Sequence, residues 1–184
     1  MTKKYSITLC LILILLGVNS KEIFCQNDFS AGIYAGGGLI TGNSFSQSSF
    51  NVSIFVESGF EIIPNVTPRL SFLYAQDFDA ILPNTRDKYY SLLNGINLKG
   101  ITSQYFEHSI FLEEGVGLLA LNDRIFSDTN VWDYGTVLSV LIGVDLRDFN
   151  LKGIKLGLGI EYGLTFNNTL ANYYSLYLQM QYAM

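Results

Sequence analysis

Apolar and polar side chains alternate along much of this chain with a period of two residues. In residues 154–166, every second side chain from Ile154 to Phe166 is apolar, and the residues between them are Gly, Lys, Glu or Thr. Successive side chains of a β-strand point to opposite faces, whereas an amphipathic helix repeats its apolar positions every three or four residues. This segment is therefore predicted to be a strand with one apolar and one polar face.

The same alternation predicts seven more strands. It is clear in residues 50–62, 138–147 and 174–182, and weaker in residues 29–40, 69–76, 89–99 and 107–121. The segment 29–40 is rich in glycine, which a strand tolerates where it bends or approaches another backbone closely. In 107–121, Glu113 and Glu114 are adjacent, so one of them breaks the alternation, and we expect a β-bulge there.

The connections between the predicted strands differ in length. Residues 64–67 and 148–153, after the second and sixth strands, form short turns. Outer-membrane barrels have short periplasmic turns, longer outer loops and an even number of strands. With the N-terminus in the periplasm, the first, third, fifth and seventh connections would face outward, and these include the longest ones. They are residues 41–49, 77–88, 122–133 and 167–172, while residues 100–106 form the remaining inner connection.

Composition identifies the surroundings of these strands. The chain is 49% hydrophobic, yet beyond its first residues no apolar run approaches the length of a membrane-spanning helix. Only helices and closed barrels satisfy the backbone within lipid. We therefore predict an all-β fold, a closed antiparallel eight-stranded transmembrane β-barrel in the bacterial outer membrane. A soluble periplasmic barrel around an apolar cavity is the alternative. Aromatic residues near strand ends favour the membrane reading, as interfacial girdles; they are Phe50, Phe60, Tyr89, Tyr90, Phe149, Phe166, Tyr173, Tyr174 and Tyr182.

The first residues have the layout of a secretory signal peptide. Two lysines precede an apolar run over residues 7–18, and small or polar residues follow it. The run is shorter than the roughly 20 residues of a spanning helix, which argues against a membrane anchor. Cleavage is expected after Ser20 or after Cys25; lipid attachment at Cys25 is disfavoured by the residues that precede it. We divide the chain into a signal peptide, 1–25, and a barrel domain, 26–184.

Charged residues fall on the predicted polar faces, which would line the lumen. An eight-stranded barrel is only wide enough for its own side chains, and buried charges must pair or be hydrogen-bonded. We therefore expect a network of salt bridges that plugs the barrel, with a narrow polar conduit as the alternative. The expected members are Glu57, Glu61, Arg69, Lys99, Glu113, Arg147, Lys155 and Glu161.

Residues that could carry chemistry are few. His108 is the one histidine, and Ser109 beside it would point to the opposite face of a strand, so catalysis by this pair is not expected. Aspartates in the predicted outer loops lack the spacing of a calcium motif and are read as solvated charge. The acidic balance of 16 acidic against 11 basic residues argues against nucleic-acid binding. No enzyme activity, cofactor or metal is predicted.

The layout resembles a family of small outer-membrane β-barrels common in Bacteroidetes, the PorT-like proteins, and more distantly the OmpX and OmpW type. The resemblance is carried by the glycine-rich stretch 30–38, by residues 95–99 with 112–117, and by the glycine-rich seventh and short last strands. It implies insertion by the outer-membrane assembly machinery, and it gives no catalytic residue. Barrels of this kind usually end in Phe or Trp, whereas this chain ends in Tyr182, Ala183 and Met184.

Three functions are compatible with this reading. The first is a non-enzymatic integral barrel with a structural, adhesive or assembly role, in contact with outer-membrane lipid and able to bind a surface ligand through its outer loops. The second is a small pore or carrier for hydrophobic solutes, which requires an open lumen or a gap in the wall. The third is a lipid-modifying enzyme that uses His108.

Overall fold

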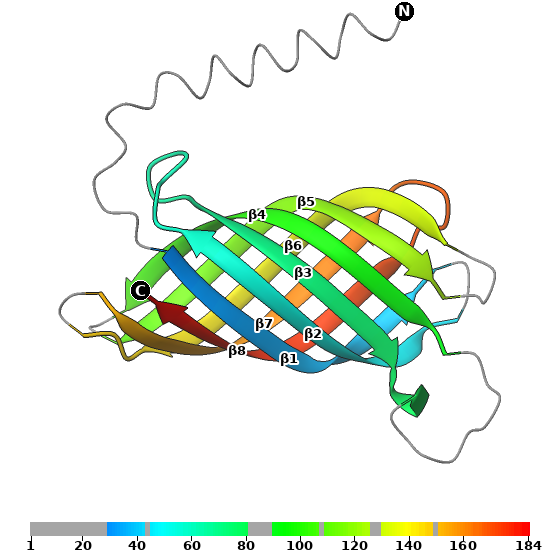
Figure 1. Cartoon of the computed structure of the whole chain (residues 1–184), viewed down its shortest axis with the longest axis horizontal. Coiled ribbons are helices and arrows are strands. Elements are labelled where there is room, and N and C mark those ends of the chain that lie inside the picture. Colours follow the sequence, from blue (N-terminus) through cyan, green and yellow to red (C-terminus); the bar gives the residue numbers. More distant parts are fainter. Residues whose placement is uncertain (1–28, 43–44, 81–89, 107–108, 126–129, 149–150) are drawn as a thin grey trace, which may run out of the picture.

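The computed structural model shows a barrel of antiparallel strands in which each strand pairs with its sequence neighbours and the last pairs with the first (Figure 1). It describes residues 29–42, 45–80, 90–106, 109–125, 130–148 and 151–184. The predicted signal peptide and His108 lie outside these residues. The elements are β1 (Phe29–Thr41), β2 (Gln47–Ser58), β3 (Thr67–Asp77), the short 3-10 helix η1 (Phe78–Ala80), β4 (Leu92–Phe106), β5 (Ile110–Arg124), β6 (Val131–Asp145), β7 (Gly153–Thr165) and β8 (Asn172–Ala183).

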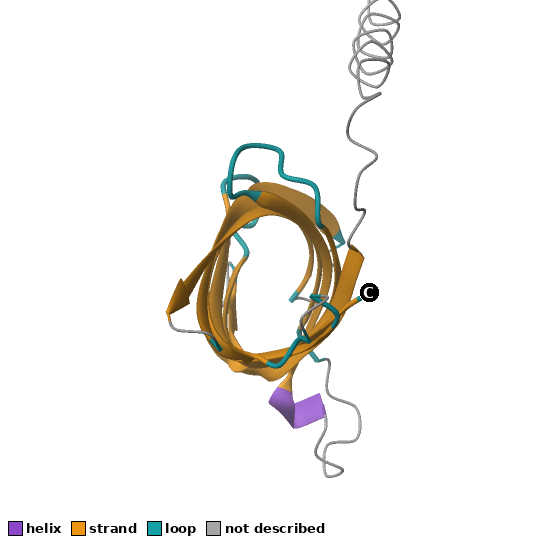
Figure 2. Ribbon diagram, turned by 90° about the vertical axis from the view of Figure 1, so that its left-hand side faces the viewer, coloured by secondary structure: helices purple, strands orange, loops and turns teal. Residues whose placement is uncertain are grey.

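The strands are staggered around the barrel. Starting at Ala31 and following the paired residues once around leads to Thr41, near the other end of β1, rather than back to Ala31. Such a stagger tilts the strands against the barrel axis and sets the diameter for a given strand number. Turned by 90° from the view of Figure 1, the barrel shows its strands as a closed ring (Figure 2).

The period of two separates an apolar outer wall from a mixed interior. In β7, Ile154, Leu158 and Ile160 are 40–49% exposed, whereas Lys155 and Glu161 are at most 5% exposed. All eight strands keep this alternation between their outer and inner faces. Exposed apolar patches this extensive are not found on water-soluble monomers. The surroundings of the outer wall are therefore lipid. Among the described residues, no helix is long and apolar enough to cross a membrane.

Three strands extend further than the polarity of their residues suggested. Residues 102–106 continue β4 and pair with β5 as far as Phe106 with Ile110, so 100–106 is not the expected turn. At the other end, β5 and β6 pair up to Asp123 with Val131, inside the expected loop 122–133. Backbone pairing does not depend on the polarity of the side chains, so polar residues such as Thr102 and Gln104 continue a strand whose apolar alternation has stopped, and the sequence pattern underestimates the length of these strands. By contrast, β2 ends at Ser58, so Phe60 and Ile62 belong to a turn.

These differences weaken the expected contrast in connection length. Four connections lie at one end, which we call the loop end: residues 42–46, 78–91, 125–130 and 166–171. Three lie at the end that carries Phe29 and Met184, which we call the termini end: residues 59–66, 107–109 and 146–152. Only 78–91 is distinctly longer than the others. The expected alternation of long and short connections therefore arose largely because polar residues at the ends of strands were counted as loop.

The expected bulge and girdles also need correction. Glu113 and Glu114 both keep the regular register with β4 and β6, so no bulge is present; Glu113 faces the lumen and Glu114 the outer wall. Of the aromatic side chains expected at the membrane interfaces, Phe166, Tyr174 and Tyr182 are 41–60% exposed, whereas Tyr173 is fully buried in the lumen.

A prediction follows from the seam between β1 and β8. A Cβ atom at Gly36 would lie 2.0 Å from the carbonyl oxygen of Leu176, whereas at the neighbouring Gly37 the nearest atoms are 3.5 Å away. Gly36→Ala should lower the free energy of unfolding by about 1–3 kcal/mol, the usual cost of overpacking. Gly37→Ala should change it by less than about 0.5 kcal/mol. Urea titration in lipid vesicles, followed by fluorescence of Trp132, measures both, and equal effects would contradict the prediction.

Candidate functional site

The lumen contains two groups of polar side chains, and within each group the members are joined by ion pairs or hydrogen bonds. The first, which we call the Arg69 cluster, comprises Glu57, Arg69, Glu113 and Lys155, from β2, β3, β5 and β7. The second, the Glu161 cluster, comprises Tyr34, Lys99, Glu161 and Tyr173, from β1, β4, β7 and β8. The alternation of polar and apolar residues predicts that all these side chains point into the lumen, because each occupies an inward position of its strand.

Arg69 is the centre of the first cluster. It is 3% exposed; its Nη2 lies 2.5 Å from Oε2 of Glu57 and 2.8 Å from Oε2 of Glu113. Nη1 donates to Oε1 of Gln179 and Nη2 to Oε1 of Gln181, each at 3.4 Å, and the guanidinium lies 4.5 Å from the centre of the Phe55 ring. Guanidinium presents a rigid fork of donors, which suits a site with several acceptors. Arg69 thus connects walls of the barrel that are far apart in the sequence.

Lys155 completes the Arg69 cluster. Its ammonium donates to Oε1 of Glu113 at 2.6 Å and lies 4.1 Å from the centre of the Phe111 ring. Glu113 is therefore held between two cations, one on each carboxylate oxygen. A carboxylate that is 2% exposed requires this compensation, because an unpaired buried charge is costly.

Glu161 has three partners: it accepts a hydrogen bond from each of two tyrosine hydroxyls and forms an ion pair with a lysine. The hydroxyls of Tyr34 and Tyr173 each donate to Oε1 at 2.6 Å, and Lys99 forms an ion pair with Oε2. The ring of Tyr34 stacks on that of Tyr177 with a centroid distance of 4.3 Å. These rings, together with the carboxylate they surround, occupy the space in the lumen on the loop-end side of Arg69.

Two of the eight residues expected in the lumen lie elsewhere. Glu61 is exposed in the turn 59–66, where its Oε2 accepts a hydrogen bond from the backbone N–H of Asn65 at 3.0 Å. The reason is that β2 ends before it. Arg147 lies at the mouth on the termini end and pairs with Asp145 at 2.6 Å, while donating to the hydroxyl of Tyr105 at 2.9 Å. The hydrogen bonds that its guanidinium donates to the carboxylate of Asp145 raise the pKa of Arg147 above its ordinary value.

The uncharged members of the clusters were not anticipated. Tyr34, Tyr173, Gln179 and Gln181 are at most 4% exposed, and each donates or accepts a hydrogen bond within the clusters. The alternation does place them on inward faces, so a search for hydrogen-bonding side chains at inward positions would have found them. A search for charged residues alone does not find these uncharged members.

The ion pairs and hydrogen bonds of the two clusters join β2, β3, β5 and β7, and β1, β4, β7 and β8, across the lumen. The wall has no gap at the glycine-rich strand, because β1 pairs with β8 from Ser30 with Ala183 to Thr41 with Asn172. Among the described residues, no three His, Cys, Asp or Glu side chains are placed to hold a metal ion.

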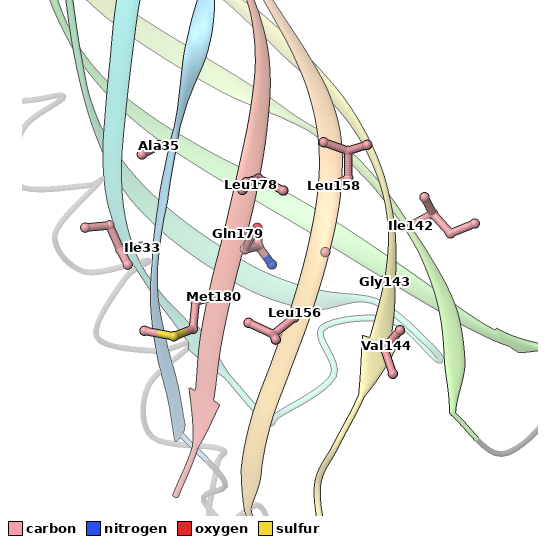
Figure 3. Close-up of a pocket in the computed structure, with 11 residues that line it drawn as sticks. Ile33, Ala35, Ile142, Gly143, Val144, Leu156, Leu158, Leu178, Gln179 and Met180 are labelled. Carbon is pink, nitrogen blue, oxygen red and sulfur yellow. The ribbon is translucent and has the colours of Figure 1, made fainter.

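A hollow of the described surface lies on the outer wall. It is a groove of about 550 Å³ over β1, β6, β7 and β8 (Figure 3). Its lining is almost entirely apolar, with Ile33, Leu158, Leu178 and Met180 among the side chains that face outward. A groove of this chemistry on a lipid-facing wall suits an acyl chain of the surrounding membrane and offers no group for catalysis.

The comparisons with known proteins agree with this architecture. No protein-family model and no curated protein sequence matches the chain. The crystal structure of Neisserial surface protein A is similar with a TM-score of 0.67 at 10% identity, covering 84% of this chain and 96% of that one. The chain has the fold of a small bacterial outer-membrane β-barrel.

A second outer-membrane barrel is also similar. It is Ail, the attachment invasion locus protein of Yersinia pestis, in a crystal structure with the heparin analogue sucrose octasulfate. The TM-score is 0.53 at 6% identity, and the match covers 87% of this chain and 100% of that one. At such identities the likeness concerns the fold. The apolar outer wall of this chain is independent support for the fold of an outer-membrane barrel.

The Arg69 cluster predicts a strong dependence of stability on Glu113. Glu113→Gln would leave Lys155 buried without its carboxylate, and breaking a buried ion pair in this way typically costs about 3–5 kcal/mol. Glu61→Gln, in the exposed turn, should cost less than about 0.5 kcal/mol. Urea unfolding in vesicles should separate the two variants clearly. A cost below about 1 kcal/mol for Glu113→Gln would contradict the structural role given to the cluster.

Proposed function

We propose that this chain is a non-enzymatic outer-membrane barrel that acts through its loop end, in an adhesive, structural or assembly role. The observation that carries the proposal is the pairing of side chains across the lumen in the Arg69 and Glu161 clusters. This pairing supports a plugged lumen, so we assign the specific role to the loop end, whose connections carry exposed side chains.

The loop end is well suited to present a binding surface. The backbone N–H and hydroxyl of Thr169 donate to Oδ2 of Asp133 at 3.1 and 2.5 Å, which ties the connection 166–171 to β6. Phe45 is 94% exposed, and Phe166 and Leu170 are 60% and 56% exposed. Phe166 and Leu170 belong to this anchored connection and Phe45 to the connection 42–46, so the loop end carries apolar side chains that a partner could cover.

The charge of this end restricts the class of ligand. Asp77, Asp123 and Asp133 lie at inward positions near its mouth, and the basic side chains of the lumen clusters lie deeper in the barrel. Ail was crystallised with a sulfated heparin analogue. For this chain, we expect repulsion of polyanions and a preference for neutral or cationic partners, because complementary charge steers association.

The proposal includes the closer resemblance stated above. The glycine-rich β1 supports membership of the Bacteroidetes-type, PorT-like group, and with it insertion by the outer-membrane assembly machinery. Matching this chain by an alignment of sequences from that group would test the assignment. Lipid modification through His108 finds no support, and mass spectrometry of lipid A from cells with and without the gene would detect it.

The role of the loop end can be tested by exchanging connections. Residues 78–91 are replaced with a two-residue hairpin turn, and a matched control shortens the turn 59–66 at the termini end. Both variants should still shift on a gel after boiling, which shows folding. Attachment of expressing cells to surfaces and to one another should fall only when 78–91 is replaced. Unchanged attachment would contradict a function of this loop.

Closure of the lumen predicts the electrical behaviour of the barrel. In planar lipid bilayers, the natural chain should give no channels of reproducible size, because ion pairs obstruct the passage. The double variant Arg69→Ala with Glu113→Ala removes the central side chains and should increase the frequency of conducting events. Stable channels formed by the natural chain would instead favour a pore.

A further inference from the structure

Polar side chains, one of them ionisable, interrupt the outer wall on the neighbouring strands β4 and β5 toward the termini end. Glu114 is exposed and faces outward between Leu112 and Val116 on β5. Its registered partner on β4 is Thr102, and the next outward residue of β4 is the exposed Gln104. On the other side its partner is Val140 of β6, which is 45% exposed.

The depth of Glu114 makes it unusual. Ile110 and Leu112 occupy the two outward positions between it and the end of β5, so it lies within the apolar wall rather than at its edge. Within the described strands, the other charged side chain at an outward position is Arg124, the last residue of β5. An ionisable side chain on the lipid face is costly and usually marks a functional contact.

The three polar side chains have no partner among the described residues. The side chains of Thr102, Gln104 and Glu114 form no hydrogen bond or ion pair with any residue that the structure describes. The wall over β1, β7 and β8 is different, since it presents only apolar side chains to lipid around the groove (Figure 3). The barrel thus has an apolar side and a side with unsatisfied polar groups.

We infer that the β4–β5 face is the interface with a second copy of this chain. Two copies inserted in the same direction are related by a two-fold axis along the membrane normal. Such an axis next to this face places β5 of one copy opposite β4 of the other at equal depth. In this isologous arrangement, Glu114 faces Thr102 and Gln104 of the second copy, and the contact occurs twice.

The chemistry of the three side chains supports this occupant. A carboxylate accepts hydrogen bonds, whereas the threonine hydroxyl and the glutamine amide donate them. Each face therefore carries both halves of a complementary set. Lipid tails offer no donor, and association through polar groups between membrane-embedded surfaces is favoured because the alternative is an unsatisfied group in hydrocarbon.

The interface is tested by cross-linking in native outer membranes. In a background with Cys10 and Cys25 replaced by Ser, Val116→Cys places a thiol beside Glu114. Leu178→Cys places a thiol of similar exposure on β8 (61% and 68% in the natural residues). A short bis-maleimide should give at least five times more dimer with Val116→Cys than with Leu178→Cys. Equal yields from the two folded variants would overturn the proposal.

A second pair of variants tests the polar contact itself. Added to Val116→Cys, Glu114→Leu should reduce the dimer yield at least five-fold, whereas Glu114→Gln, which still accepts hydrogen bonds, should keep most of it. Heat-modifiability gels verify folding of each variant. If Glu114→Leu forms as much dimer, or if the cross-linked product has the mass of a different protein, pairing of two copies through Glu114 is wrong.

Discussion

Within a membrane, every backbone N–H and C=O group must find its partner inside the protein, because hydrocarbon offers none. In this chain the requirement is met by pairing β8 back onto β1 from Ser30 with Ala183 onward, so that the sheet has no edge. The glycines of β1 belong to this solution. At Gly36 and Gly38, a Cβ atom would collide with carbonyl oxygens of β8. The closure is therefore a matter of backbone packing as well as of hydrogen bonding.

Closure in turn fixes what the interior can be. A barrel of this strand number leaves no room for bulk water, so the polar faces of the strands must satisfy one another. The Arg69 and Glu161 clusters achieve this with three cations and three carboxylates, supplemented by Tyr34, Tyr173 and glutamine side chains. The resulting lumen is a mixed core, in which these paired polar groups pack beside buried apolar side chains such as Phe55, Phe111 and Leu121.

The outer wall gives the molecule two different sides. The wall over β1, β7 and β8 is apolar and grooved, as expected of a surface solvated by lipid. Glu114 with Thr102 and Gln104 makes the β4–β5 wall different, and the loop end differs again through its anchored connections and aspartates. Any specific recognition by this barrel depends on these polar surfaces, because the remainder of the wall is matched to lipid.

The alternation in the sequence was sufficient to predict the eight strands, their closure and the inward position of six of the eight residues expected in the lumen. A period of two is a local property, and each strand of this barrel has the same two environments along its length. Tertiary structure decided what depends on neighbouring strands. Pairing with β5 extended β4 to Phe106, the end of β2 excluded Glu61, and the regular register placed Glu114 in the lipid-facing wall. Tertiary structure also selected the partners, such as Arg69 with Glu113, because strand tilt and stagger bring together side chains that no sequence spacing relates.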